Sequence, residues 1–405
     1  MCSIVEDEFE NEGSHAMIED ILLPQEIALD EICKKCKLEK VLIKLNLKDG
    51  KCKECFIAYV VHKFRASLGS TKIVRRGADV LLNFDGSPAS VCLLHMYIDS
   101  AKELHKKLDF KLHLIYIDEI LSPEINSSHL QNIQVILDQF KDIICYYVNL
   151  GSRNELRDMR NRKTNGNNEE FLGIFKSIQS LTAKQEFVSR TKTNQLYKAA
   201  NDLNCQYIFY ADIGIDLAKT MLSNISLGRT SVAHDVQFCD DRNEDIKIIR
   251  PVRDLTLPEI NHYLRLMNLN YLNNVKSFGA DNGSSASIQN LTSAFVDGLQ
   301  KNFSSTISTV FKTGDKIKHS TSLSNIHCVF CNSSIDYKNS SALFAIEYSR
   351  LVSADAQNHV SSDSVEKEAE KAVNGDLREL QKKLCHSCRN IFTGIEDEEV
   401  AKILQ

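Results

Sequence analysis

The chain has 405 residues, of which 43% are hydrophobic and 25% charged, a balance typical of a soluble globular protein with two or three domains. No apolar run reaches the ~18–20 residues needed to span a bilayer, and the acidic N-terminus lacks the basic and apolar regions of a secretory signal. The sequence therefore argues against the membrane and secreted classes and predicts a cytoplasmic protein without membrane contact.

The formal net charge of −5 hides a strong asymmetry between the first two segments. Residues 1–31 contain ten Asp or Glu and no Lys or Arg, which predicts an acidic disordered tail. Residues 33–76 contain thirteen Lys or Arg against three acids, which favours contact with nucleic acid over an ordinary solvated face. The predicted nucleic-acid-binding residues are Lys34, Lys35, Lys37, Lys51, Lys53, Lys63, Arg65, Arg75 and Arg76.

Eight of the 13 cysteines form four Cys-x-x-Cys pairs, and two pairs fall in this basic segment. Fifteen residues separate Cys33/Cys36 from Cys52/Cys55, enough for a short hairpin that brings four thiolates around one Zn²⁺. Gly50, within "KDGK", is available for a turn with positive φ. Residues 32–76 are therefore predicted to be a zinc ribbon followed by a basic helix over "FIAYVVHKFRASLG". A redox role for the cysteines is the alternative.

Residues 77–272 alternate between apolar strands and helices of 10–15 residues, which predicts βαβ units and a doubly wound parallel sheet. The expected strands are "DVLLNF", "KLHLIYID", "DIICYYVNL", "CQYIFYAD" and "IKIIRP". Thr256 and Glu259 form a capping box at the start of the last helix. The turn Asp85–Ser90 follows the first strand, at a place where such sheets usually hold phosphate.

The remaining chain contains a Ser/Thr-rich stretch and the second set of paired cysteines. Residues 273–326 are predicted to be a linker. Residues 327–405 contain Cys328/Cys331 and Cys385/Cys388, separated by 53 residues that include a polar, partly helical insertion. This spacing predicts a second four-cysteine zinc module, and an iron–sulfur cluster is the alternative at either set.

Several stretches together resemble the PP-loop ATP pyrophosphatases that modify tRNA, and more narrowly the cytoplasmic tRNA 2-thiolation protein 2 family. They are the first Cys₄ set with "HKFRASLG", the turn after the first strand, "GRTSVAHDVQFCDDR", "IIRPVRDLTLPEI" and the terminal "CVFC…LCHSC". The resemblance extends from about Cys33 to the C-terminus. It implies an α/β core of PP-loop/HUP-like type, flanked by N-terminal and C-terminal Cys₄ zinc modules.

Active members of the larger family carry Ser-Gly-Gly-x-Asp-Ser in the turn, where backbone N–H groups wrap a pyrophosphate. In this chain Asp85, Ser87 and Ala89 depart from that pattern, and only Gly86 and Ser90 remain. A carboxylate at Asp85 would repel a polyphosphate. The turn is therefore predicted to be a vestigial phosphate loop in which ATP binds weakly or not at all.

A second family signature is reduced here to "ADIGIDLAKTMLSN", in which Asp212 and Asp216 persist. Asp212 is expected to cap the following helix. Arg250 and Arg253 follow a strand end, where they either face tRNA or a partner subunit or form a salt bridge to Asp254 or Glu259.

No residue is predicted to be catalytic. Cys92, Cys145 and Cys205 lie in apolar runs, which indicates small core residues. Cys239, in the polar "FCDDR", is the best candidate for an exposed thiol.

The resemblance implies a non-catalytic, tRNA-binding subunit of a heterodimeric complex that thiolates the wobble uridine of tRNA at C2. The implied partners are tRNA, a catalytic PP-loop subunit (protein 1 of the pair) and a thiocarboxylated ubiquitin-like sulfur carrier. Two alternatives stay open. One is an active ATP-dependent tRNA thiolase, and the other is a zinc scaffold for the carrier without RNA contact.

Overall fold

The computed structural model describes residues 31–45, 50–102, 108–119, 123–140, 143–152, 156–159, 169–229, 232–273, 278–302, 304–317, 326–335, 380, 383–395 and 397–404. The predicted acidic tail, apart from Glu31, and the predicted helical insertion between the last two Cys pairs lie outside these residues.

A seven-stranded sheet forms the centre of the molecule, in the order β6-β5-β4-β3-β7-β9-β8. Its five central strands are parallel: β5 (Cys145–Asn149), β4 (Phe110–Asp118), β3 (Ala78–Asn83), β7 (Tyr207–Phe209) and β9 (Lys247–Ile249). The edge strands β6 (Arg157–Asp158) and β8 (Cys239–Asp240) run antiparallel to their neighbours. The strand order reverses between β3 and β7, so the turn after β3 lies at the switch point of a doubly wound sheet, as the sequence predicts.

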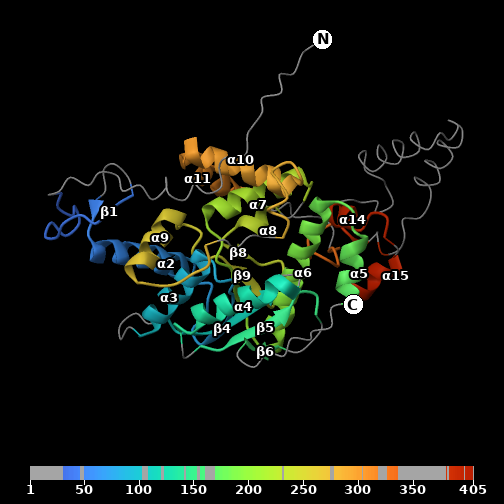
Figure 1. Cartoon of the computed structure of the whole chain (residues 1–405), viewed down its shortest axis with the longest axis horizontal. Helices are drawn as coiled ribbons and strands as arrows, with labels where there is room; N and C mark the ends of the chain where they lie inside the picture. The colour runs from blue at the N-terminus through green and yellow to red at the C-terminus, as the bar shows by residue number, and fades with distance from the viewer. Residues whose placement is uncertain are drawn as a thin grey trace, which may run out of the picture.

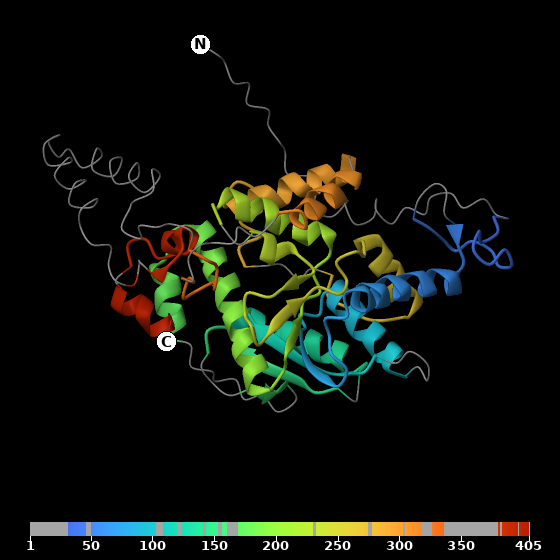
Figure 2. The ribbon, with the colours of Figure 1, turned by 180° about the vertical axis from the view of Figure 1, so that it is seen from behind.

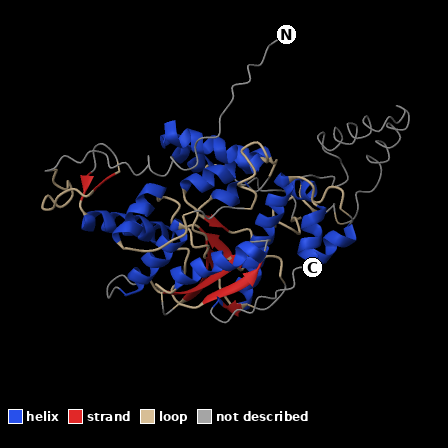
Figure 3. Ribbon diagram, in the orientation of Figure 1, coloured by secondary structure: helices blue, strands red, loops and turns tan. Residues whose placement is uncertain are grey.

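Helices cover both faces of the sheet. Successive side chains of a strand point to opposite faces, so those of β3 pack alternately into two cores. Val80 and Leu82 face one core, whereas Leu81 faces the other. The first core is covered by α2 (Lys53–Thr71), α3 (Pro88–Lys102), α4 (Pro123–Leu137) and α9 (Leu257–Leu266). The second is covered by α5 (Glu169–Ser177), α6 (Leu181–Asp202) and the C-terminal α14 (His386–Ile391) and α15 (Asp397–Leu404), as Figures 1 and 3 show.

The predicted linker over 273–326 contains two helices, α10 (Ile288–Asn302) and α11 (Ser304–Gly314). They pack against α7 (Gly214–Ser226) and α8 (Val232–Val236) around a third small core. Val296 and Ile307 are buried in it at 0% and 5% exposure. The expectation of a plain linker was wrong for this stretch, because a few apolar residues at helical spacing outweigh its Ser/Thr-rich composition.

The two Cys₄ modules lie at opposite ends of the long axis (Figures 1 and 2). The N-terminal module contains the predicted hairpin, formed by β1 (Ile43–Lys44) and β2 (Gly50–Lys51). Gly50 has no positive φ; a Cβ there would come within 2.7 Å of Val41 Cγ2, so glycine is needed for close packing instead. No described helix combines the length and apolar character needed to cross a membrane.

Candidate functional site

Both predicted cysteine sets are assembled by the fold. Cys33, Cys36, Cys52 and Cys55 have their sulfur atoms within 4.8 Å of one another, and so do Cys328, Cys331, Cys385 and Cys388. One Sγ–Sγ distance is 3.8 Å in the first set, between Cys36 and Cys52, and one is 3.6 Å in the second, between Cys331 and Cys385.

The two sets share one local construction. Each begins with a knuckle in which the residue after the second cysteine, Lys37 or Asn332, has a positive φ of 58° or 53° and donates its N–H to the first cysteine's carbonyl. Each ends on a helix whose N-cap is the third cysteine, Cys52 of α2 or Cys385 of α14. The third and fourth sulfurs therefore lie at a helix N-terminus, where the helix dipole favours thiolates.

This arrangement fits one tetrahedral metal ion. Four sulfurs at about 2.3 Å from a central Zn²⁺ are separated by about 3.8 Å along each edge of the tetrahedron. A cubane cluster binds each thiolate to a different iron and so needs a wider set of sulfurs. Four thiolates this close would also repel one another without a cation between them.

The apolar side chains next to the N-terminal set are exposed to solvent. Cys33 is fully buried, yet its neighbours Ile32, Leu38 and Leu42 are 55%, 87% and 51% exposed. Burial raises the pKa of Cys33, but N–H groups of Cys36, Cys52 and Lys35 outweigh it and lower that pKa to about 6. Backbone N–H groups close by in the sequence therefore stabilise the Cys33 thiolate.

The C-terminal set is built into the second core. All four cysteines are buried beside Phe187, Phe330 and Phe392, whose ring centroids lie 5.3–6.0 Å apart. A network of buried charges lies next to them, and its members are Glu186, Arg190, Arg229, Asp235, Asp240 and Arg242.

Asp235 lies at the centre of this network. It accepts hydrogen bonds from Arg190 Nη2 at 3.0 Å and from Asn224 Nδ2 at 2.8 Å, and it pairs with Arg242. Burial raises the pKa of Asp235, but Arg190, Arg242 and Arg229 together hold it well below its usual range. Sequence reasoning missed this network, although Arg229, Asp235, Asp240 and Arg242 all fall in "GRTSVAHDVQFCDDR".

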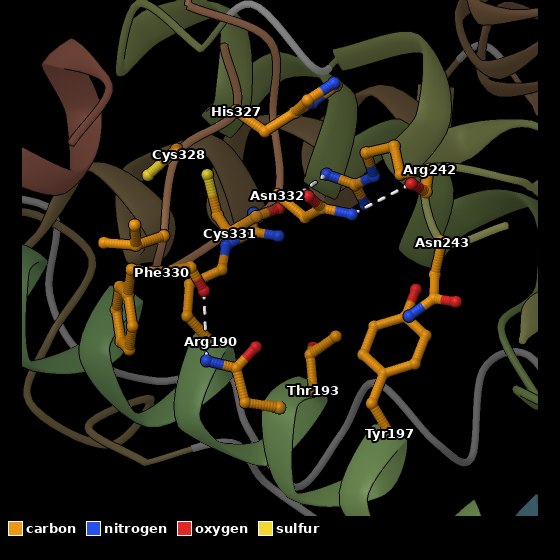
Figure 4. A pocket seen from close by; sticks show the side chains of 12 residues that line it. Arg190, Thr193, Tyr197, Arg242, Asn243, His327, Cys328, Phe330, Cys331 and Asn332 are labelled. Atoms are coloured by element: carbon orange, nitrogen blue, oxygen red, sulfur yellow. Dashed lines mark hydrogen bonds between the residues drawn. The ribbon is translucent and has the colours of Figure 1, made fainter. Parts of the chain in front are cut away.

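A pocket of about 460 Å³ opens beside the C-terminal set. Figure 4 shows Thr193 and Tyr197 of α6 on one side of the opening and the Cys328–Cys331 knuckle on another. Asn332 Nδ2 donates to the carbonyl of Arg242 at 2.9 Å across this wall. The pocket is therefore lined by residues that include two of the four cysteines, Cys328 and Cys331.

The turn after β3 is closed by hydrogen bonds between its own residues. Asp85 Oδ1 accepts the backbone N–H of Ser87 at 2.9 Å, and the buried Ser90 hydroxyl donates to the Ser87 carbonyl at 3.1 Å. Gly86 has a φ of 76°, and a Cβ there would come within 2.6 Å of Ile133 Cδ1. The Gly86 carbonyl accepts the N–H of Leu272 at 2.8 Å. The Asp85 carboxylate thus accepts a backbone N–H that the phosphate loop of an active family member would offer to phosphate.

The surroundings of the turn carry excess negative charge. The carboxylates there are Asp85, Asp118, Glu119, Asp212 and Asp216, and the described cations near them are Lys192, Lys219 and Arg250. All three cations are engaged, Lys192 with Glu119, Lys219 with Asp297 and Arg250 with Asp212. Such surroundings repel a polyphosphate unless further cations are supplied.

The cysteines outside the two sets that the structure describes are poor nucleophiles. Cys92, Cys145 and Cys205 are 0%, 4% and 3% exposed, as core residues should be. Cys239 is half-buried, and burial followed by Asp241 raises its pKa to about 11. It is a neutral thiol at pH 7.

Three sequence expectations in this region are corrected. Asp212 does not cap α7 but pairs with Arg250, and Asp216 Oδ2 instead accepts the N–H of Ile213 at 3.2 Å. Arg250 and Arg253 do not face an outside partner, because they are 5% and 4% exposed. The ion pairs that the structure shows for them are Arg250 with Asp212 and Arg253 with Asp315 of the segment after α11, where the sequence pointed to Asp254 or Glu259.

The nine predicted nucleic-acid-binding residues fall into two separated groups. Lys34, Lys35, Lys37 and Lys53 are exposed on the N-terminal module, and Lys51 lies over the Tyr59 ring. Arg75 and Arg76 are exposed beyond the other end of α2, whose 19 residues span about 28 Å. Between them, Arg65 is half-buried and Lys63 Nζ donates to Glu259 Oε1 at 2.8 Å.

Comparison with known proteins identifies relatives over nearly the whole chain. The family model described as cytoplasmic tRNA 2-thiolation protein 2 matches residues 287–390. The chain is 40% identical to the cytoplasmic tRNA 2-thiolation protein 2 of Anopheles gambiae, covering 97% of this chain and 99% of that protein. It is also 40% identical to the protein of the same name from Aedes aegypti, covering 98% and 100%.

The fold is similar to that of the U34-tRNA thiolase NcsA from Methanococcus maripaludis, a structure solved with its [4Fe-4S] cluster. The alignment has a TM-score of 0.53 at 15% identity and covers 76% of this chain and 93% of NcsA. This likeness supports the PP-loop-type α/β architecture. Given the identity and coverage of its sequence relatives, the chain belongs to the cytoplasmic tRNA 2-thiolation protein 2 family.

Proposed function

We propose that the chain is a non-catalytic subunit of a tRNA 2-thiolation complex, which binds tRNA and supports a catalytic PP-loop partner. Family membership supports a role in tRNA 2-thiolation. The closed turn carries the non-catalytic part of the proposal, because Asp85 accepts the Ser87 N–H and the surroundings of the turn are rich in carboxylates. The family name also supports a cytoplasmic location.

The chemistry then belongs to the partner. There, ATP activates the C2 oxygen of the wobble uridine, a thiocarboxylated ubiquitin-like carrier supplies sulfur, and AMP leaves. This chain contributes binding surface instead. The rival reading as an active thiolase lacks an open phosphate loop, and its best candidate for an exposed thiol, Cys239, stays neutral at pH 7.

We further propose zinc in both Cys₄ sets. Cys33, Cys36, Cys52 and Cys55 would hold one ion and Cys328, Cys331, Cys385 and Cys388 the other, each as a structural site with no open coordination position. The close sulfur spacing favours a single ion over an iron–sulfur cluster. Elemental analysis of anaerobically purified protein should find two zinc ions and no cluster absorption; iron with sulfide would overturn this assignment.

The N-terminal module is the proposed tRNA surface. Reversing the charge of Lys34, Lys37 and Lys53 together should weaken tRNA binding and flatten the salt dependence of log K by about 2–3 units, because each phosphate contact contributes about −0.9. None of these three lysines belongs to the cysteine set that would bind the metal, and all three are exposed. A matched control reverses the exposed Lys301, Lys312 and Lys316 near α10 and α11.

The control should bind tRNA with the wild-type salt slope. An unchanged affinity and slope in the Lys34/Lys37/Lys53 variant would place the RNA surface elsewhere and favour the scaffold for the sulfur carrier. Circular dichroism and zinc content verify that each variant is folded.

A further inference from the structure

Arg229 is a buried guanidinium with unused donors. It follows α7, its side chain is 1% exposed, and its Nη2 pairs with Glu186 Oε2 on α6. Its Nε and Nη1 are buried, and within the described part of the chain they have no hydrogen-bond partner. Buried charged donors left unpaired are costly, so an acceptor is expected beside them.

The C-terminal cysteine set is the neighbour that offers such acceptors. Gly228 lies next to the first residue of α14, between two cysteines of this set, since a Cβ on it would lie 3.4 Å from His386 Cδ2. Glu186, the partner of Arg229, is followed on α6 by Phe187, whose ring centroid lies 6.0 Å from that of Phe330 between Cys328 and Cys331. The guanidinium is therefore held on the side of α6 that packs against this set.

The other two arginines of the network are directed elsewhere. Arg190 donates through Nη1 and Nη2 to Asp235, and its remaining buried donor, Nε, lies 3.8 Å from Glu186 Oε2. Arg242 binds Asp235 and Asp240. Arg242 Nη1 also reaches the Cys331 carbonyl at 3.5 Å, which is not a sulfur contact. Arg229 therefore has two unused N–H groups beside a cysteine set that carries net negative charge when it binds a divalent ion.

We propose that metal binding supplies these acceptors: with the ion bound, Arg229 donates N–H···S hydrogen bonds from Nε and Nη1 to the thiolates of the C-terminal Cys₄ centre. This inference rests on the proposed metal in that set. Arg229 is a positioning residue: Glu186 fixes one end of its guanidinium, and the other end orients the sulfurs and offsets their charge. Through Glu186, the C-terminal metal centre is tied to α6 of the core.

The test compares Arg229→Met with Arg253→Met in the full-length chain. Arg253 is a matched control because it is 4% exposed and pairs with Asp315 rather than with a residue of the cysteine sets. Zinc release to a chromophoric chelator should show a fast phase from the partly buried N-terminal set and a slow phase from the fully buried C-terminal set. Arg229→Met should weaken metal binding at the C-terminal set about 10–100-fold, seen as faster release in the slow phase alone.

Arg253→Met should leave both phases unchanged, even if it lowers the melting temperature. Arg229→Lys keeps the charge but cannot place two N–H groups, so it should fall between wild type and Arg229→Met. In Co²⁺-substituted protein, Arg229→Met and Arg229→Lys should shift the sulfur-to-cobalt charge-transfer bands, and Arg253→Met should not.

Wild-type release and bands in Arg229→Met would overturn the proposal, as would equal acceleration by Arg253→Met. If Arg229→Met does not fold, the cobalt spectrum of Arg229→Lys decides, and unshifted bands there would contradict the inference. A wild-type chain that binds no metal at the C-terminal set would instead defeat the proposed metal site itself, so the two failures are distinguishable.

Discussion

The two Cys₄ modules use the same knuckle and the same helix start, yet they differ in what surrounds them. The N-terminal set lies at one end of the molecule beneath exposed Leu38 and Leu42, and backbone N–H groups face Cys33. The C-terminal set lies against Phe187 and the buried ion network of the core. The ligand set fixes which ion can bind, whereas the surroundings decide what else depends on that ion.

The largest contrast is expected between Cys388→Ser and Cys36→Ser. Metal binding at structural zinc sites is worth about 10–16 kcal/mol in small domains, and it becomes folding free energy where the site is part of a core. Cys388→Ser should lose one metal and lower the main melting transition strongly, because Phe330 and Phe392 lose their support. Cys36→Ser should also lose one metal but leave that transition near the wild-type temperature.

Calorimetry with metal analysis measures both variants. Equal effects on the main transition would remove the distinction between a peripheral and an embedded module.

The next effect concerns the ion network that only the C-terminal set possesses. Asp235→Asn should lower the free energy of unfolding by about 3–5 kcal/mol at pH 7, because it leaves buried arginines without their carboxylate. The pKa of Asp235 is depressed in the folded state, so its contribution is full above the unfolded value of about 3.9 and is lost as pH falls further.

The wild-type and Asp235→Asn stabilities should therefore converge below about pH 4 and stay apart above it. Urea unfolding at a series of pH values measures this. A difference that grows on acidification would contradict the assigned ionisation of Asp235.

A smaller effect is expected at the contact that joins the N-terminal module's helix to the core. Lys63 Nζ donates to Glu259 at 2.8 Å and to the Asp254 carbonyl at 3.1 Å. Lys63→Met should cost about 1–2 kcal/mol, the range for hydrogen bonds to charged groups after allowing for partial exposure.

Because Lys63 is engaged with Glu259, Lys63→Met should weaken tRNA binding less than Lys53→Met, whose side chain is exposed. Fluorescence titration with tRNA compares the two. A larger loss in Lys63→Met would mean that Lys63 leaves Glu259 to bind RNA.

The smallest effect is expected from nucleotide. Mg-ATP should shift the melting temperature of the wild-type chain by less than about 1 °C, since a ligand that does not bind the folded state does not stabilise it. Replacing Asp85, Ser87 and Ala89 with Ser, Gly and Asp should raise nucleotide affinity without giving thiolation. Conversion of ATP to AMP by the wild-type chain, abolished by Gly86→Val, would restore the active-thiolase alternative.

Much of the fold could be predicted because its signals are local. The apolar runs before Asp85 and Asp118 became β3 and β4, and Thr256 with Glu259 caps α9 as expected. The two-residue edge strands β6 and β8 are too short to show alternation, so the sequence gives no signal for them.

The cysteine sets were predictable from spacing, but their surroundings were not. Arg229 and Glu186 are 43 residues apart in sequence, and only the packing of α6 against the end of α7 brings them together. The same holds for Lys192 and Glu119, which are 73 residues apart and pair near the turn after β3. Charge pairs formed by tertiary packing leave no periodic trace in a single sequence.

Hydrogen exchange in α6 during stepwise metal removal tests the central claim most directly. After a chelator removes the first metal, exchange should rise around Cys33–Cys55 while α6 (Leu181–Asp202) stays protected. Loss of the second metal should deprotect α6, because Phe187, Glu186 and Arg190 pack against that centre and its network. Deprotection of α6 with the first metal, or continued protection after the second has left, would contradict the account.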